Sequence, residues 1–87
     1  MVTGAASGIG RATAIRFAAE GYDVCLNDLV ERELNLVKAD LAAGDHLVLA
    51  GSYADALTLS AGSALISERW GRLDALVNCA GVFERSD

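Results

Sequence analysis

Short apolar runs alternate along the chain with longer segments in which apolar residues recur every three or four positions. The periodic segments predict amphipathic helices, and the apolar runs predict buried strands. A first helix is predicted to begin at Ile9 and to end at Gly21, and further helices are predicted over residues 31–43 and 55–70. Strands are predicted over residues 24–26, 46–50 and 73–78, after a short strand that runs into Thr3.

Each predicted helix has one apolar side that we expect to be buried against a sheet. In the first helix this side comprises Ala12, Ile15, Ala18 or Ala19, and Tyr22. In the second it comprises Leu34, Val37 and Leu41, and Gly44 lies just beyond the end. In the third it comprises Leu57, Ala61, Leu65 and Ile66 or Trp70, and Gly71 is the stop signal.

Strands that alternate with helices are typical of a parallel sheet covered by helices on both faces. Because the crossover connections of such sheets are right-handed, we expect the four strands in the order 3-2-1-4, with the first strand central. The sequence therefore predicts an α/β fold, a partial doubly wound parallel sheet of the Rossmann type.

The connection between the first strand and the first helix is rich in glycine and reads Thr3-Gly4-Ala5-Ala6-Ser7-Gly8-Ile9-Gly10. Gly4 permits a sharp turn, Gly8 lets the backbone approach a phosphate, and Gly10 lets the helix pack closely. Unpaired N–H groups in the first helical turn make an anion site, where Ser7 would cap the helix or donate to a phosphate. The alternative is an ordinary strand-to-helix connection, because the spacing G-x-x-x-G-x-G differs from the common G-x-G-x-x-G.

Asp28 follows the second predicted strand and lies 18 residues after Gly10. A carboxylate near this spacing binds the adenosine ribose of a dinucleotide, whereas the alternative role is that of a turn residue or helix cap. The carboxylate would repel the additional phosphate of NADP, and neither Ser7 nor Leu29 is a cation that could receive that phosphate. The sequence therefore predicts NAD as the cofactor. A P-loop is excluded because Arg11 follows Gly10 where that motif has lysine.

Composition and charge narrow the classes of partner. The chain has 87 residues, of which 53% are hydrophobic, and this content favours a folded domain. A net charge of -5 gives no electrostatic reason to bind nucleic acid or an anionic membrane. Cys25 and Cys79 lack the spacing of a metal or redox motif, so we expect reduced cysteines, Cys25 in a buried strand, and a cytoplasmic protein. His46 stands alone near a strand start and is expected to be structural.

Two motifs, in order and over essentially the whole length, resemble the short-chain dehydrogenase/reductase family. Residues 3–10 match its T-G-x-x-x-G-I-G turn, and residues 76–81, Leu-Val-Asn-Cys-Ala-Gly, are similar to its L-V-N-N-A-G segment, while Asp28 and residues 71–74 lie between them. A methyltransferase would leave residues 78–81 unexplained. The resemblance implies an NAD(P)-binding domain of the Rossmann type, which in the complete enzyme serves hydride transfer between a small-molecule alcohol and a ketone, and a homo-oligomer.

The resemblance also implies the cofactor-binding residues. Those that would hold the pyrophosphate are Gly4, Ser7, Gly8, Ile9 and Gly10. Asp28 would hold the adenosine ribose, and Asn78, Ala80 and Gly81 would lie along the cofactor. Cys79 departs from the family pattern, where the loss of an amide is expected to cost a structural hydrogen bond. Gly51 or Ser52 stands where the family often has an aspartate against the adenine.

The catalytic Tyr-x-x-x-Lys pair of that family, whose tyrosine exchanges a proton with the substrate oxygen, has no counterpart in this sequence. Tyr22 and Tyr53 are the only tyrosines, and each is followed four positions later by a leucine. We therefore assign no catalytic residue. Residues 1–87 are interpreted as the N-terminal half of the domain, truncated at both ends, with an apolar strand start expected upstream and the Tyr-x-x-x-Lys downstream. The alternative is a non-catalytic nucleotide-binding or interaction fragment.

Overall fold

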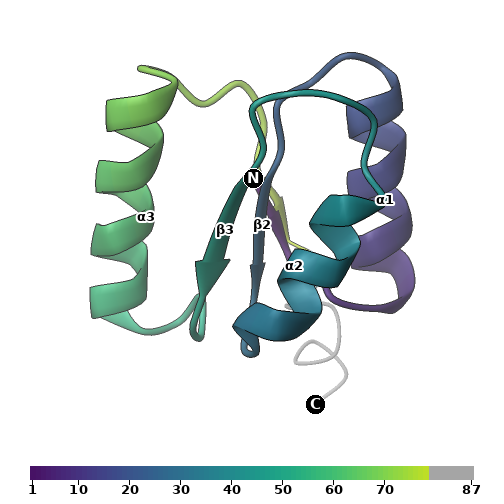
Figure 1. The fold of residues 1–87 in the computed structure, drawn as a ribbon. Coiled ribbons are helices and arrows are strands. Elements are labelled where there is room, and N and C mark those ends of the chain that lie inside the picture. Colours follow the sequence, from purple (N-terminus) through teal and green to yellow (C-terminus); the bar gives the residue numbers. More distant parts are fainter. Residues whose placement is uncertain (79–87) are drawn as a thin grey trace.

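The computed structural model describes residues 1–78 of the chain and arranges them as a sheet between two layers of helices. The elements are β1 (Val2–Thr3), α1 (Gly8–Ala19), β2 (Cys25–Asp28), α2 (Glu31–Ala39), β3 (Leu47–Ala50), α3 (Ala56–Arg69) and β4 (Val77–Asn78). Helices α1 and α2 cover one face and α3 covers the other (Figure 1). The doubly wound α/β fold predicted from the sequence is confirmed.

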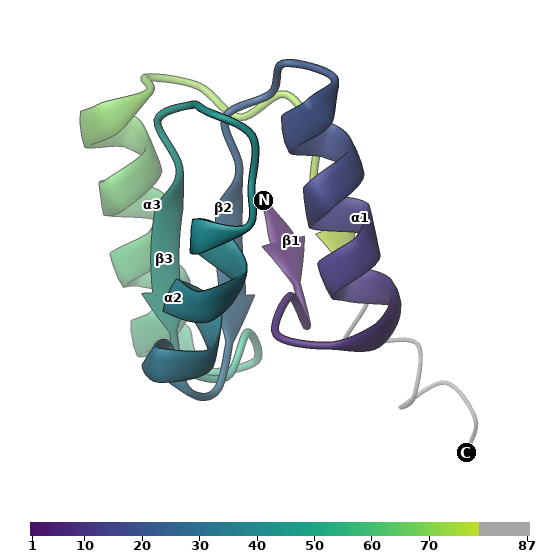
Figure 2. The same cartoon turned by 45° about the vertical axis from the view of Figure 1, so that its right-hand side comes forward.

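The strands are parallel and lie in the order β3-β2-β1-β4, as right-handed crossovers require. Val2 pairs with Leu26 on one side and with Val77 on the other, so β1 is central among the described strands. Figure 2 shows β1 between β2 and the start of α1, with the connection from β1 to α1 at the carboxyl end of the strand. The N-termini of the helices and the carboxyl ends of the strands therefore lie at the same edge.

The core has two parts because successive residues of a strand point to opposite faces. Val24 and Leu26 pack with residues of α1 and α2, whereas Cys25, which lies between them, packs with Leu47 and Leu49 of β3 and Ile66 of α3. In α2, Leu34 and Val37 are buried as predicted. That helix ends at Ala39, before the predicted end at residue 43. The residues beyond it form the loop in which the Ala42 carbonyl lies 2.6 Å from His46 Nε2.

The buried side of α1 differs in part from the predicted one. Ala18 is buried as predicted, together with Gly10 and Ala14, whereas Ala12 is exposed and Tyr22 is 46% exposed. Apolar residues occur all around α1, so their periodicity does not select one side. The side with the smallest side chains lies on the sheet, because it lets the helix approach most closely. Tyr22 instead packs edge-to-face on Phe17, with ring centroids 5.0 Å apart.

The predictions for α3 and β4 were partly wrong for a similar reason. Ile66 is buried, but Leu57 is 81% exposed and Ala61 is also exposed. The helix approaches β3 at Gly62, where a methyl group would lie 2.6 Å from Leu49 Cδ2. Strand β4 begins at Val77 and not at the predicted residue 73, because β1, its partner, begins at Val2, which is in register with Val77.

His46 has the structural role predicted for it. Its buried imidazole accepts a hydrogen bond from the Val24 N–H at Nδ1, 3.0 Å away, and donates from Nε2 to the Ala42 carbonyl. The ring therefore joins the loop before β3 to the residue before β2.

Cys25 is fully buried, and burial raises the pKa of its thiol from 9.0 to about 11. In the unfolded chain the thiol ionises near pH 9, so the unfolded state binds fewer protons than the folded state between pH 9 and 11. We therefore expect the Cys25 thiol to lower the free energy of unfolding in urea by about 2 kcal/mol when the pH is raised from 8 to 10.5. The Cys25→Ala variant, which keeps all other titrating groups, should lack this part of the loss. An equal loss in both proteins would contradict the assignment to Cys25.

Candidate functional site

The sequence-predicted site residues that the structure describes lie at the carboxyl edge of the sheet. Thr3, the last residue of β1, pairs with Asn27 in β2 and with Asn78 in β4. The glycine-rich turn therefore begins beside Asp28 and beside the backbone of Asn78. Ala80 and Gly81 lie outside the described residues. Crevices at this edge are where open parallel α/β sheets bind their ligands.

Two glycines give the turn its shape. Gly4 has φ +67° and Gly8 has φ +59°, a conformation that residues with a Cβ rarely adopt. A Cβ at Gly8 would meet nothing within 4 Å. At this position glycine is therefore required by the backbone conformation, and the space above it is open to a ligand.

Gly10 is required by close packing. A methyl group at this position would lie 2.6 Å from the carbonyl carbon of Gly4 and still closer to its oxygen. The sequence predicted close packing of the helix on the sheet, and the structure shows that α1 rests on the turn itself. Any side chain at Gly10 would push the first turn of the helix away from Gly4.

The N-terminus of α1 faces solvent. Ser7 is the N-cap residue with extended backbone, but its side chain makes no capping hydrogen bond, contrary to one of its two predicted roles. Ser7, Gly8 and Ile9 are all exposed, and Ile9 is 70% exposed. The first N–H groups of a helix have no partner within the helix, and the helix dipole adds positive potential there. The start of this 12-residue helix can therefore accept an anion.

The Asp28 carboxylate is fixed beside the turn by two backbone donors. Oδ2 accepts a hydrogen bond from the Ala6 N–H at 2.9 Å, and Oδ1 accepts one from the Leu29 N–H at 2.8 Å. The carbonyl oxygen of Asp28 also accepts a bond from the Gly51 N–H at 2.9 Å. Asp28 is half-buried, so part of its surface is open at the edge of the sheet.

Asn27 is a second residue that shapes this edge, and the sequence analysis assigned it no role. Its buried side chain donates from Nδ2 to the carbonyl oxygens of Leu49, at 2.8 Å, and Gly51, at 3.1 Å. Its own carbonyl oxygen accepts a bond from the Ala5 N–H at 2.9 Å. The signal in the sequence was a polar residue directly after the apolar run 24–26, at the end of the strand, since polar residues that are buried are hydrogen-bonded.

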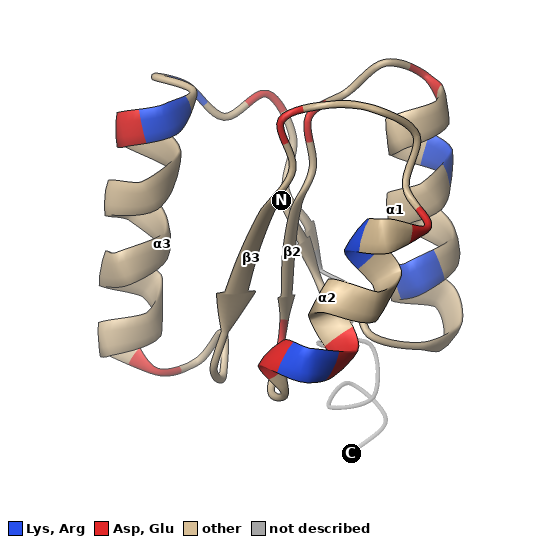
Figure 3. Ribbon diagram, in the orientation of Figure 1, with Lys and Arg blue, Asp and Glu red and all other residues tan. Residues whose placement is uncertain are grey.

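Acidic residues dominate the charge next to Asp28. Figure 3 shows acidic positions at the end of β2 and in the first turn of α2, where Arg32 lies between Glu31 and Glu33. On α1, Arg11 forms an ion pair with Asp40 at 2.9 Å. This edge therefore combines a helix N-terminus suited to an anion with a carboxylate suited to hydroxyl groups.

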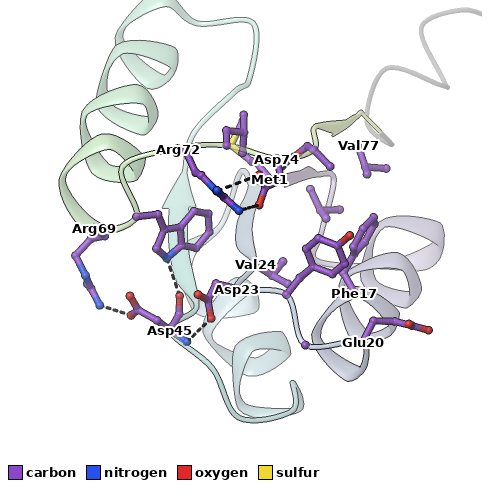
Figure 4. A pocket seen from close by; sticks show the side chains of 16 residues that line it. Met1, Phe17, Glu20, Asp23, Val24, Asp45, Arg69, Arg72, Asp74 and Val77 are labelled. Carbon is purple, nitrogen blue, oxygen red and sulfur yellow. Dashed lines mark hydrogen bonds and ion pairs between the residues drawn. The ribbon is translucent and has the colours of Figure 1, made fainter.

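A cavity of about 630 Å³ lies at the opposite, amino-terminal edge of the sheet (Figure 4). Both arginines of its lining are paired with carboxylates: Arg69 with Asp45, and Arg72 with Asp74 at 3.2 Å. The Met1 ammonium donates to the Ala75 carbonyl at 2.7 Å, and burial lowers the pKa of this amine. Because α1 and α3 end there, their unpaired carbonyls disfavour an anion. We therefore place the candidate site at the carboxyl edge.

Within residues 1–78, no helix is long and apolar enough to cross a bilayer. The same residues contain no cluster of three or more side chains that could ligate a metal.

Comparison with known proteins agrees with this geometry. A family model described as short chain dehydrogenase matches residues 1–87. A short-chain dehydrogenase/reductase of Armillaria gallica is 46% identical over an alignment 87 positions long, and the match covers 94% of this chain and 33% of that protein. A solved short chain dehydrogenase from Bacillus anthracis has a TM-score of 0.83 at 29% identity, covering 88% of this chain and 32% of that chain.

A second solved structure is that of YwfH, described as an NADPH-dependent reductase involved in bacilysin biosynthesis. It has a TM-score of 0.79 at 32% identity, and the match covers 86% of this chain and 33% of that chain. The chain thus spans about a third of the length of each of these relatives.

Proposed function

Because the chain belongs to the short-chain dehydrogenase family, we propose that residues 1–87 are the cofactor-binding half of an NAD-dependent oxidoreductase. The complete enzyme would transfer a hydride between the nicotinamide ring and the carbon of a small-molecule alcohol or ketone. One observation carries the proposal: the glycine-rich turn and the Asp28 carboxylate adjoin at the carboxyl edge of a parallel sheet, joined by the bond from Ala6 N–H to Oδ2.

Each predicted site residue has a place in this proposal. Nicotinamide dinucleotide would supply the hydride chemistry, and the protein would bind and orient it. The exposed N-terminus of α1, with Ser7, Gly8 and Ile9, would hold the pyrophosphate, while Gly4 and Gly10 keep the turn compact. Asp28 would accept hydrogen bonds from the adenosine ribose. Asn78, Ala80 and Gly81 would follow the cofactor toward its nicotinamide end.

NAD is preferred to NADP in this proposal, although one structural relative is described as NADPH-dependent. The additional phosphate of NADP lies on the adenosine ribose, where Asp28 would repel it. Leu29, which follows Asp28 and is 68% exposed, carries no charge to offset this repulsion. A cytoplasmic location and a homo-oligomeric complete enzyme remain predictions from the sequence.

Titration calorimetry with both dinucleotides tests the cofactor assignment. We expect the chain to bind NAD at least about tenfold more tightly than NADP, because like charges brought together cost several kcal/mol. The Leu29→Arg variant should narrow or reverse this preference by placing a cation beside the additional phosphate. The Leu36→Arg variant adds the same charge at an exposed position further along α2 and should keep the preference. Equal affinities in the wild-type protein would refute the NAD assignment.

The 87-residue chain is proposed to bind the cofactor without turning it over, since neither Tyr22 nor Tyr53 is followed by a lysine four positions later. Incubation with NAD and a panel of secondary alcohols should give no NADH absorbance. Turnover by the chain would show that the proton transfer is performed by residues to which we assign no such role.

A further inference from the structure

We propose that Asp28 is a positioning residue for the glycine-rich turn, which it holds in its binding conformation before any nucleotide arrives. This proposal rests on the proposed nucleotide-binding function. It assigns to Asp28 a contribution to affinity that does not pass through the ribose hydroxyls.

The hydrogen bonds between β2 and the turn support this role. Two consecutive N–H groups of the turn are held by two consecutive residues of β2: Ala5 by the carbonyl oxygen of Asn27 and Ala6 by Oδ2 of Asp28, both at 2.9 Å. The pairing of β1 with β2 ends at Thr3 and Asn27. The Asp28 side chain therefore continues the attachment to β2 along the turn, beyond the last paired residues of β1 and β2.

The backbone on both sides of Ala6 explains why this additional attachment matters. Gly4 and Gly8 both have positive φ, and glycine has more conformational freedom than any other residue in the unfolded chain. A turn bounded by two such residues needs fixed points between them to keep one shape. The N–H groups of Ala5 and Ala6 are the two groups that are fixed by hydrogen bonds, and the bond of Ala6 depends on the side chain of Asp28.

The carboxylate is itself rigidly held. Its second oxygen accepts from the Leu29 N–H, and the Asp28 carbonyl accepts from Gly51 across the strand pair with β3. Hydrogen bonds to a charged acceptor are stronger than those between neutral groups. Asp28 therefore joins the turn to the sheet through a carboxylate with little freedom to move, so the N-terminus of α1 is oriented without help from the ligand.

The alternative is that Asp28 acts only as a direct ribose ligand and that its bond to Ala6 has no effect on affinity. A pair of nucleotides separates the two roles. ADP carries both ribose hydroxyls, whereas 2′,3′-dideoxy-ADP carries the same adenine and pyrophosphate but no hydroxyl for Asp28 to bind. A pure ribose ligand affects the first nucleotide only, and a positioning residue affects both.

The experiment measures the affinity of both nucleotides for the wild-type chain and for Asp28→Ala by titration calorimetry. We expect Asp28→Ala to weaken 2′,3′-dideoxy-ADP by about tenfold, the effect of losing one hydrogen bond to a charged group, and to weaken ADP further. Unchanged or improved affinity for the dideoxy nucleotide would overturn the proposal, because removal of the negative charge alone favours an anion.

Amide hydrogen exchange of Ala6, followed by NMR without ligand, provides a second measurement. The Ala6 amide should be protected in the wild type and should exchange at least about tenfold faster in Asp28→Ala. Equal exchange rates would overturn the proposal even if the nucleotides bind. Failure of both nucleotides to bind the wild-type chain would instead overturn the proposed function, whereas the exchange result would still report on the attachment of the turn.

Asp23→Ala is the matched control. Asp23 also accepts a hydrogen bond from a backbone N–H, that of Asp45 at 2.9 Å, but it lines the cavity at the amino-terminal edge. This variant should leave Ala6 exchange and both affinities within about twofold of the wild type. If Asp28→Ala does not fold, Asp28→Asn replaces it, because one of the two accepting oxygens becomes an NH2 group that cannot accept a hydrogen bond, and the remaining oxygen carries no charge. In Asp28→Asn, faster exchange of the Ala6 amide together with weaker binding of 2′,3′-dideoxy-ADP supports the proposal, whereas wild-type exchange of Ala6, or faster exchange with unchanged affinity, overturns it.

Discussion

Substitution of Gly10 by alanine should lower the free energy of unfolding by about 3 kcal/mol or more, as overpacking against backbone atoms forces the chain to shift. The added methyl group would meet the carbonyl group of Gly4, and backbone cannot rotate away as a long side chain can. Urea unfolding followed by circular dichroism measures the loss. NAD binding should also fall below detection, because displacement of α1 moves its N-terminus, at Gly8, away from the position in which it would hold the pyrophosphate.

Gly71→Ala separates crowding from backbone conformation in this experiment. Gly71 has φ +79°, but a methyl group there would meet nothing within 4 Å. We expect a loss of only about 1 kcal/mol, the cost of placing an alanine in a left-handed conformation. If Gly10→Ala were no more damaging than Gly71→Ala, the tight contact between α1 and Gly4 would be refuted.

Replacement of Asn27 by leucine should cost about 3 kcal/mol of stability, because the carbonyl oxygens of Leu49, in a buried bond, and of Gly51, in a half-buried one, would lose their donor. Leucine has the same number and branching of side-chain heavy atoms as asparagine but larger terminal groups, so the change removes both hydrogen bonds and adds some overpacking. The loop at Gly51 should loosen first, which amide exchange of its N–H would detect.

Asn35→Leu makes the same chemical change at an exposed position of α2 and should alter stability by no more than about 0.5 kcal/mol. If Asn27→Leu unfolds at the same urea concentration as the wild type, the hydrogen bonds of the Asn27 amide make no net contribution to stability.

The sequence was sufficient to predict the topology, because the apolar runs are short and each is separated from the next by a helix with clear stop signals. It was not sufficient to predict which side of α1 is buried. Ala12 is as apolar as Ala14, and the choice between them depends on how closely each side lets the helix approach the sheet. Leu57 was misplaced because the close approach of α3 occurs at Gly62, which carries no hydrophobic signal.

For the candidate site, the residues that could be proposed from the sequence are those whose type is required by the local backbone or by their place in the strand order. Gly4 and Gly10 follow from turn and packing requirements, and Asp28 follows from its position after a buried strand. The bond from Ala6 to Asp28 could not be predicted, since alanine side chains carry no polar group and the donor is backbone. Asn27 was missed because a polar residue at a strand end looks like part of a turn until its partners in β3 are known.

The half-buried Met1 ammonium has a practical consequence for the design of expression vectors. Any residue fused before Met1 turns this charged group into a neutral amide that can still donate to the Ala75 carbonyl, and the fusion linker would start at a residue that lines the cavity. An affinity tag at that end would therefore change the stability of the sheet, and removal of the tag by a protease would change it again. Variants should be compared only between proteins that share the same first residues.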